Sequence, residues 1–230
     1  MTCCCSTTSK TWVFTVIAVV IIGLLTANAY FSAKDSVGVS ARAGLQSTAA
    51  VMASQIDGSE VAGLQPGDEN TLKYHVIVNK LRTMRSMNDR IVNAYILKVN
   101  PDQSATFLVD DLTFSDPAGS APIGEISTDP NRDAIFTALS VPSSSATPYT
   151  TKYGTFMTAY APIDDSPNDS TGNTVAVLAI DISATTYEDA ANASTFAILL
   201  TGIVSAILVV GCIFLCCRAS GVAGGKEERK

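Results

Sequence analysis

Residues 174–182 read TVAVLAIDI, a run that is apolar except for Thr174 and Asp181. A short run rich in β-branched residues is typical of a buried strand. Residues 183–192 continue helically into an uncharged stretch that is long enough to cross a membrane. We therefore expect a strand that closes a β-sheet and leads into a membrane helix.

Four further strands are predicted before this one. Residues 91–99 (IVNAYILKV) and 105–110 (ATFLVD) flank a Pro-containing turn and predict a hairpin. Residues 149–152 and 155–162 predict two more strands around Gly154. The five strands should form one antiparallel sheet.

A long crossover, residues 111–148, separates these two pairs of strands and should cover one face of the sheet. Asp129-Pro130 predicts a short helix that starts there, with Asp129 as its cap, and ends at about Leu139. Residues 141–148 are expected to form a Ser-rich loop. A long crossover over a sheet is where a ligand pocket would form.

Two long helices are predicted before the sheet. Apolar or small residues recur every three to four positions from Val37 to Ile56, and Asp57-Gly58 should end this helix. A second helix is expected from about Thr71 to Asn88, and its core stripe should comprise Tyr74, Ile77, Val78, Leu81, Met84 and either Met87 or Asn88. Helices packed on the other face of one antiparallel sheet give an α+β fold.

Two stretches, residues 12–31 and 196–217, contain no charged residue. About 20 apolar residues cross a bilayer as a helix. A cleaved signal peptide is the alternative for the first stretch, although Ala27 and Ala29 make a weak cleavage signal. The expected organisation is a cytoplasmic N-terminus (1–11), a transmembrane helix (12–33), an extracytoplasmic domain (34–189), a second transmembrane helix (196–217) and a cytoplasmic tail (218–230).

The formal net charge of −6 is unevenly distributed along the chain. Residues 34–189 carry ten basic and nineteen acidic side chains, whereas Lys10 and the tail 218–230 add positive charge outside the two apolar stretches. Positive residues favour the cytoplasmic side, so both termini should lie inside and the acidic domain outside. The acidic balance gives no support for nucleic-acid binding.

The six cysteines lie beside or within the two apolar stretches and are absent from residues 34–189. The outer domain therefore has no disulfide and must be stabilised by its core. A soft-metal site is disfavoured because the spacings are not those of zinc fingers. Packing of small side chains and S-acylation both remain open, and the acylation candidates are Cys3, Cys4, Cys5, Cys216 and Cys217.

The sequence does not support an enzyme. The chain has a single His, and the outer domain has no Cys, so the residues needed for a Ser–His or Cys–His catalytic pair are almost absent. Residues 164–173 alternate oxygen-bearing side chains but lack the Gly and Glu of a calcium loop, so we expect no metal and no cofactor. Asn168 lies in an N-x-S sequon in this loop and is a candidate glycosylation site.

Several stretches of residues 34–187 are familiar in combination. They include Phe107-Leu108-Val109-Asp110, Tyr153-Gly154, Tyr160-Ala161-Pro162-Ile163 and the closing strand 175–182. This set resembles the extracytoplasmic Cache (PAS-like, PDC) sensor domains of prokaryotic chemoreceptors and histidine kinases. The resemblance implies a single PAS-like domain with a ligand cavity between sheet and crossover, dimerisation through the long helix, and signalling by helix displacement.

The sequence departs from that family at two points. Residues 87–92 (MNDRIV) stand where amino-acid-binding members have an Arg-x-Trp-Tyr element, so an amino-acid ligand is not supported. Thirteen residues follow the second apolar stretch, too few for a kinase or cyclase. We therefore expect signalling through a separate membrane or cytoplasmic partner.

The candidate ligand-binding residues are the polar and aromatic side chains of the strands. Asp181 stands where some relatives have an Asp that meets a ligand amine, although a surface or capping carboxylate is the alternative. The aromatic residues could line a pocket or belong to an ordinary sheet core. The full candidate set is Tyr95, Phe107, Asp110, Tyr149, Tyr153, Met157, Tyr160 and Asp181.

Two functions follow from these features. The first is a membrane-anchored, non-enzymatic sensory module that binds a small molecule, forms a homodimer or oligomer and signals through a partner. The second is a structural or accessory subunit of a larger membrane or cell-surface assembly that uses the same fold without a ligand.

Overall fold

The computed structural model describes residues 4–165 and 173–224. Residues 39–189 form one compact unit, and the two terminal helical segments form another. The candidate glycosylation site Asn168 and the candidate acylation site Cys3 lie outside the described residues. Of the other four candidates, Cys4 and Cys5 lie in the first turn of helix α1 and Cys216 and Cys217 lie about two turns before the end of helix α5, and their acylation stays a prediction.

The terminal segments belong to two long helices, α1 (Cys4–Ala53) and α5 (Ala184–Gly224). Each contains a stretch that is long and apolar enough to cross a membrane, within Thr15–Ala53 and Thr195–Ile213. The apolar windows are not buried inside the protein, so no protein core accounts for their composition. These are two candidate transmembrane helices that flank the domain in sequence.

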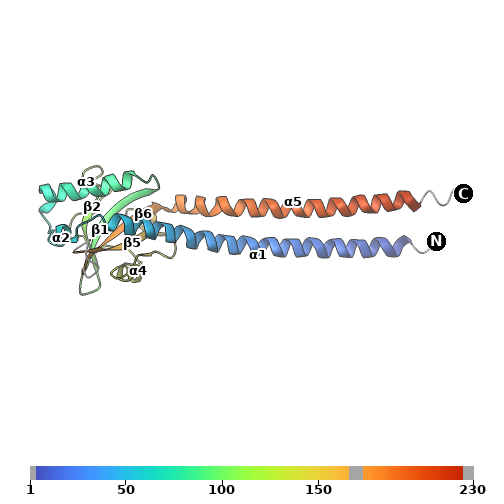
Figure 1. Cartoon of the computed structure of the whole chain (residues 1–230), viewed down its shortest axis with the longest axis horizontal. Coiled ribbons are helices and arrows are strands. Elements are labelled where there is room, and N and C mark those ends of the chain that lie inside the picture. Colours follow the sequence, from blue (N-terminus) through green and yellow to red (C-terminus); the bar gives the residue numbers. More distant parts are fainter. Residues whose placement is uncertain (1–3, 166–172, 225–230) are drawn as a thin grey trace. The chain divides into compact units, whose positions relative to one another are not determined.

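The domain is built on a six-stranded antiparallel sheet with the strand order β2-β1-β6-β5-β3, and β4 also pairs with β5. Figure 1 shows the strands and the labelled helices of the domain. The strands are β1 (Ile91–Val99), β2 (Ala105–Asp110), β3 (Ser143–Ser144), β4 (Tyr149–Thr151), β5 (Gly154–Asp164) and β6 (Thr174–Ser183).

One strand more is present than the sequence predicts. The short β3 lies within residues 141–148, which we expected to be a loop, and it pairs with β5 at Ala159 and Tyr160. The reason is the length of β5, whose eleven residues extend along one edge past its pairing with β4. An open edge offers unpaired backbone groups, and the Ser-rich segment satisfies some of them.

Strand β6 lies between β1 and β5 and is covered on both faces. Its even-numbered residues, such as Leu178 and Ile180, belong to one hydrophobic cluster, and Val177 and Ala179 belong to the other. Successive side chains of a strand point to opposite faces. Asp181 therefore points to the same face as Val177 and Ala179.

The first hydrophobic cluster contains the N-terminal helices. Helix α3 (Leu72–Ser86) buries Tyr74, Ile77, Val78, Leu81 and Met84 against the sheet, as the sequence predicts. Met87, one of the two alternatives for the end of the stripe, is 79% exposed. The prediction of Met87 as a core residue is wrong, because α3 ends at Ser86 and Met87 is its C-cap residue. Helix α1 ends at Ala53, three residues before the predicted Ile56.

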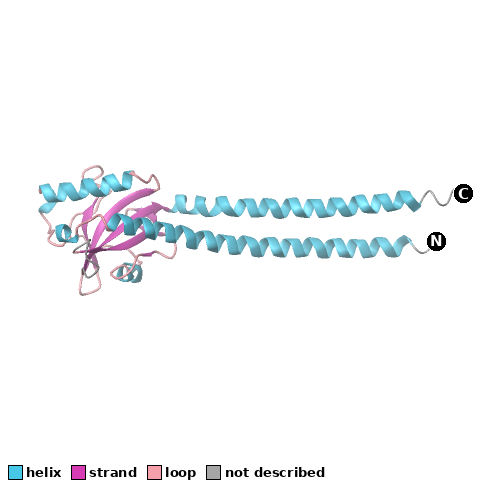
Figure 2. Cartoon of the chain, viewed as in Figure 1, coloured by secondary structure: helices cyan, strands magenta, loops and turns pink. Residues whose placement is uncertain are grey.

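The second cluster contains the crossover. Ala121, Ile135 and Ala138 pack against the opposite face of the sheet, as expected. Figure 2 shows that this connection consists mostly of loop, with the short helix α4 (Arg132–Thr137). Residues 124–127 run beside β2, because Phe107 N donates to Glu125 O at 2.9 Å and Ser127 N donates to Ala105 O at 2.8 Å.

The predicted start of the crossover helix at Asp129-Pro130 is wrong. Asn131 is the N-cap, and α4 begins at Arg132. Asp129 is instead 7% exposed, and its Oδ1 accepts a hydrogen bond from Asn131 N at 2.8 Å. Its other carboxylate oxygen accepts from phenol groups of the sheet, so this side chain is held by tertiary contacts.

Gly58 provides a test of the packing between the short helix α2 (Gly58–Val61) and the sheet. A Cβ atom there would lie 2.6 Å from Val175 Cγ2 and closer still to the carbonyl oxygen of Asp164. We expect Gly58→Ala to lower the free energy of unfolding of the full chain in detergent by about 1–3 kcal/mol. Gly63→Ala is the matched control, because its Cβ would meet nothing within 4 Å. Equal unfolding midpoints in urea for the two variants would contradict this packing.

Candidate ligand-binding site

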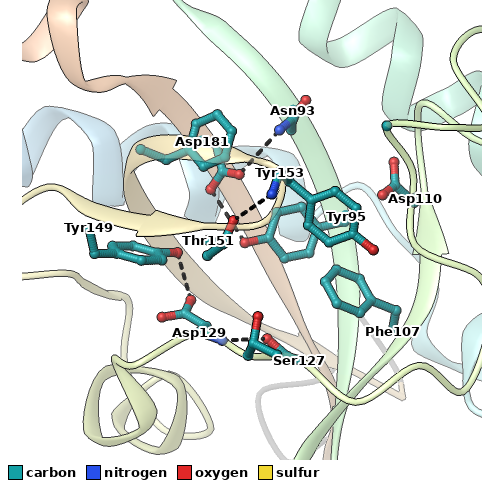
Figure 3. A pocket seen from close by; sticks show the side chains of 13 residues that line it. Asn93, Tyr95, Phe107, Asp110, Ser127, Asp129, Tyr149, Thr151, Tyr153 and Asp181 are labelled. Carbon is teal, nitrogen blue, oxygen red and sulfur yellow. Dashed lines mark hydrogen bonds between the residues drawn. The ribbon is translucent and has the colours of Figure 1, made fainter.

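A small cavity lies on the crossover side of the sheet. Its volume is about 30 Å³, which is room for one or two water molecules. Figure 3 shows it from close by, with carboxylates and phenol rings around the space. Its lining residues are Asn93, Tyr95, Phe107, Asp110, Gly119, Ser127, Thr128, Asp129, Tyr149, Thr151, Tyr153, Phe156 and Asp181.

Six of the eight candidate residues from the sequence line this cavity, namely Tyr95, Phe107, Asp110, Tyr149, Tyr153 and Asp181. Met157 does not, because it belongs to the cluster on the helix side of the sheet. Tyr160 points to the crossover side but lies behind the lining, where its OH donates to Asp129. Met157 and Tyr160 are three residues apart on β5, so the alternation of side chains along the strand directs them to opposite faces of the sheet.

The structure adds lining residues that sequence reasoning missed, foremost Asn93 and Asp129. Asn93 could have been found, because it lies two residues before Tyr95 on the same strand and therefore on the same face. Asp129 could not have been found, because its local sequence resembles a helix cap and its actual partners, Tyr149 and Tyr160, are twenty or more positions away in the sequence.

Asp181 is the most deeply buried carboxylate of the cavity, with 3% of its surface exposed. Its Oδ1 accepts a hydrogen bond from Thr158 Oγ1 at 2.6 Å and from the Tyr95 OH at 3.3 Å. Asn93 Nδ2 donates to Oδ2 at 3.4 Å. Burial raises the pKa of Asp181 to about 7, although these donors oppose the shift.

Asp129 reaches the cavity from the crossover. Its Oδ2 accepts hydrogen bonds from the Tyr149 OH, at 2.7 Å, and from the Tyr160 OH. The Tyr149 OH also lies 2.7 Å from Thr158 Oγ1. Hydroxyl groups therefore connect the two buried carboxylates. Burial raises the pKa values of Tyr95, Tyr149 and Tyr160, so these phenols stay protonated and act as donors.

Asp110 lines the cavity but uses its oxygens to hold the crossover. Oδ2 accepts from Ala121 N at 3.0 Å, and Oδ1 accepts from Leu112 N at 2.8 Å. Burial raises the pKa of Asp110 to about 6. Its neighbour Asp111 faces the other way, where it pairs with Arg85 of α3 and accepts from Ala94 N.

The crossover and the β4–β5 turn contact each other beside the cavity, at its lining residue Tyr153. The Tyr153 OH donates to Glu125 Oε1 at 2.7 Å, and Lys152 Nζ lies 2.9 Å from the same oxygen. Lys152 Nζ also lies 4.8 Å from the centre of the Tyr153 ring. We call Glu125, Lys152 and Tyr153 the rim latch.

The lining combines negative charge with aromatic surface. Asp110, Asp129 and Asp181 contribute three carboxyl groups, and no Lys, Arg or His is among the lining residues that the structure describes. The Tyr95 and Phe107 rings lie 5.2 Å apart, and the Phe107 and Tyr153 rings 6.4 Å apart. Such a site favours a cation, because aromatic faces and carboxylates both attract positive charge.

Metal binding by clustered ligands finds no support in the described ranges. Within residues 4–165 and 173–224, no three His, Cys, Asp or Glu side chains are grouped so that they could hold a metal ion.

Comparisons with known proteins give structural likenesses only. Neither a family model nor a curated protein sequence matches the chain. The ligand-binding domain of the Campylobacter jejuni chemoreceptor Tlp3 in complex with L-valine is similar, with a TM-score of 0.46 and 18% identity over 77% of this chain and 66% of that one. The Tlp3 (CcmL) sensory domain gives 0.47 and 17%, covering 77% and 67%.

The extracellular domain of the histidine kinase mmHK1S-Z2 gives a TM-score of 0.38 and 10% identity, covering 70% of this chain and 61% of that one. These neighbours are thus the ligand-binding or sensory domain of one chemoreceptor and the extracellular domain of a histidine kinase. This chain combines a long N-terminal helix with an antiparallel sheet. Its α+β class, predicted from the sequence, is confirmed by its own elements and strand order.

The rim latch can be tested without a ligand. Glu125→Ala removes the ion pair with the exposed Lys152 and the hydrogen bond from the Tyr153 OH, both of which hold the turn. We expect amide hydrogen exchange at Tyr153 and Gly154 to become about tenfold faster. Glu60→Ala changes an exposed carboxylate on α2 and should leave this exchange unchanged. Unchanged exchange in both variants would show that the latch does not hold the turn.

Proposed function

We propose that this chain is a membrane-anchored extracytoplasmic sensory module. We further propose that its cavity binds a small cation that itself carries no carboxylate group. The observation that carries the proposal is the buried lining of three carboxyl groups with no basic side chain among the described residues. A carboxylate ligand would add a further negative charge to this desolvated space, at a high cost in free energy.

The size of the cavity narrows the ligand class. About 30 Å³ admits a group close in size to one or two water molecules. An ammonium or methylammonium ion meets this limit without rearrangement. A larger organic amine requires the rim latch to open, and then Tyr95, Phe107 and Tyr153 provide aromatic surface for its alkyl groups.

The site is connected to the domain ends of both long helices. Asp181 on β6 lies three residues before α5 begins at Ala184. On the other side, Thr158 O accepts from Ser145 N at 2.9 Å. The neighbouring Ser144 Oγ accepts from Gln46 Nε2 of α1 at 3.0 Å. A cation that attracts Asp181 and shifts Thr158 would thus alter contacts at both helices, and the signal would pass to a separate membrane or cytoplasmic partner.

In this function both termini lie in the cytoplasm. The chain also pairs with a second copy of itself. A groove of about 350 Å³ between α1 and α3 is lined in part by Val51 and Met87, which are 61% and 79% exposed. Two copies anchored in one bilayer share an orientation, so this face can pair with itself about a two-fold axis. Exposed apolar surface of this kind suits such a contact.

The dimer contact has its own test. Val51→Glu places a charge in the groove, and we expect it to raise the dimer dissociation constant of the full chain in detergent at least tenfold. Leu72→Glu is the control, since Leu72 is 81% exposed on α3 and does not line the groove. Sedimentation equilibrium measures both. Equal association of the two variants would remove this face from the proposal.

A structural or accessory subunit is the second candidate function. The observation that favours it is the small cavity, which is nearly filled by its own side chains. A domain that serves only as a scaffold needs no open site.

Ligand binding separates the two functions. We expect ammonium or methylammonium chloride to raise the unfolding temperature of the full chain in detergent at pH 8, while sodium acetate does not, because a ligand that binds only the folded state stabilises it. Asp181→Asn should remove the effect, and Asp133→Asn, an exposed carboxylate on α4, should retain it. If neither cation stabilises the chain, the accessory function is favoured.

A further inference from the structure

The hydroxyl groups of Thr158 and Tyr149 connect the buried carboxylates of Asp181 and Asp129, and we call this connection the hydroxyl chain. It is one proton short. Three contacts connect it: Asp181 Oδ1 to Thr158 Oγ1 at 2.6 Å, Thr158 Oγ1 to the Tyr149 OH at 2.7 Å, and the Tyr149 OH to Asp129 Oδ2 at 2.7 Å. Each hydroxyl group carries one hydrogen, and an ionised carboxylate carries none. If both carboxyl groups are ionised, two hydrogens must serve three contacts.

One additional proton resolves this shortage. If Asp181 is a neutral acid, it donates to Thr158, Thr158 donates to Tyr149, and Tyr149 donates to Asp129. Every short contact then contains one hydrogen and all donors point in the same direction. The Tyr160 OH can still donate to Asp129, and the Tyr95 OH can still donate to Asp181.

We propose that Asp181 holds this proton in the closed cavity and that losing it at higher external pH converts the cavity into its cation-accepting form. The domain is then regulated by protons and cations that compete for one carboxyl group. The regulatory meaning rests on the proposed cation site, whereas the protonation of Asp181 stands by itself.

Among the described residues that line the cavity with Asp181, none carries a positive charge that could hold it ionised. It is faced by Asn93 and Tyr95 from β1, by Thr158 from β5, by Tyr149 from β4 and, across the hydroxyl chain, by Asp129 of the crossover. Asp110 of β2 is the third carboxyl group of the lining. Two basic groups of the domain are engaged elsewhere: Arg85 pairs with Asp111, and Lys152 with Glu125.

Burial agrees with this assignment, since it raises the pKa of Asp181 to about 7 from 3.8. A raised pKa means that the folded domain keeps a proton that the unfolded chain has already released. Its contribution to stability is therefore complete below about pH 4 and is lost as the pH rises through about 7. Asp110, whose pKa burial raises to about 6, adds a loss in the same direction at lower pH.

Loss of the proton also loosens the chain of contacts. Thr158 and Tyr149 would then each use their hydrogen for a carboxylate, and their oxygens would face each other at 2.7 Å without a hydrogen between them. Thr158 is the residue whose backbone oxygen holds Ser145. Relief of this repulsion would shift Thr158 and, with it, the segment at Ser144 and Ser145 that contacts α1.

Infrared difference spectroscopy of the full chain in detergent tests the proton directly. We expect a buried carboxylic-acid C=O component that disappears with a midpoint near pH 7 and that is missing in Asp181→Asn but present in Asp133→Asn, whereas a component from Asp110 with a midpoint near pH 6 should remain in both variants. Survival of the component with the midpoint near pH 7 in Asp181→Asn, or its absence from the unaltered chain, would overturn the assignment.

Tyr149→Phe tests the hydroxyl chain itself. This variant deletes two of the three contacts, so Thr158 alone can serve ionised Asp181 and no proton is missing. We expect the midpoint of the band to fall by about one pH unit, a tenfold loss of proton affinity. A midpoint that does not fall would show that burial alone retains the proton and would overturn the role of the chain.

Competition is measured with methylammonium chloride as the probe. We expect the stabilising effect of the cation to be at least tenfold weaker at pH 5.5 than at pH 8. Equal effects at both pH values would overturn the regulation. A band that behaves as expected without any cation effect would instead reject the proposed cation function while the protonation of Asp181 stands.

Discussion

The structure depends on a strand that is buried on both faces and paired on both edges. Strand β6 lies between β1 and β5, and its alternate side chains supply two separate hydrophobic clusters. The helices must cover one face and the crossover the other, because each cluster has to be shielded from water. This double burial also forces Asp181 out of solvent, so the central strand that stabilises the domain also creates its electrostatic problem.

That problem is reduced by hydroxyl and amide groups rather than by a counter-ion. Tyr95 and Asn93 donate to Asp181, which shares a further hydrogen bond with Thr158, and Tyr149 and Tyr160 donate to Asp129. Donors of this kind reduce the cost of burial but leave the negative charge in place. A site with charge but no counter-ion is prepared to accept a proton or a cation, and both proposals for this domain use that property.

Much of the fold could be predicted because it follows from local patterns of apolar and polar residues. Strands β1 and β2 have the predicted bounds, and the buried stripe of α3 follows helical spacing from Tyr74 to Met84. The errors occur where tertiary contacts outweigh those patterns. Residues 143–144 became a strand because β5 offered an edge, and Asp129 left its expected capping role because buried phenols offered better hydrogen bonds.

The amino-acid sequence by itself determined the α+β class, the two apolar helical stretches and six of the residues that line the cavity, because hydrophobic periodicity and residue type are local properties. Only the tertiary structure decided that Met157 faces away from the cavity, that Asp129 joins it, and that its volume is about 30 Å³. Strand register, the docking of the crossover and the sharing of protons among hydroxyls arise between residues distant in the chain. No local pattern records those distances.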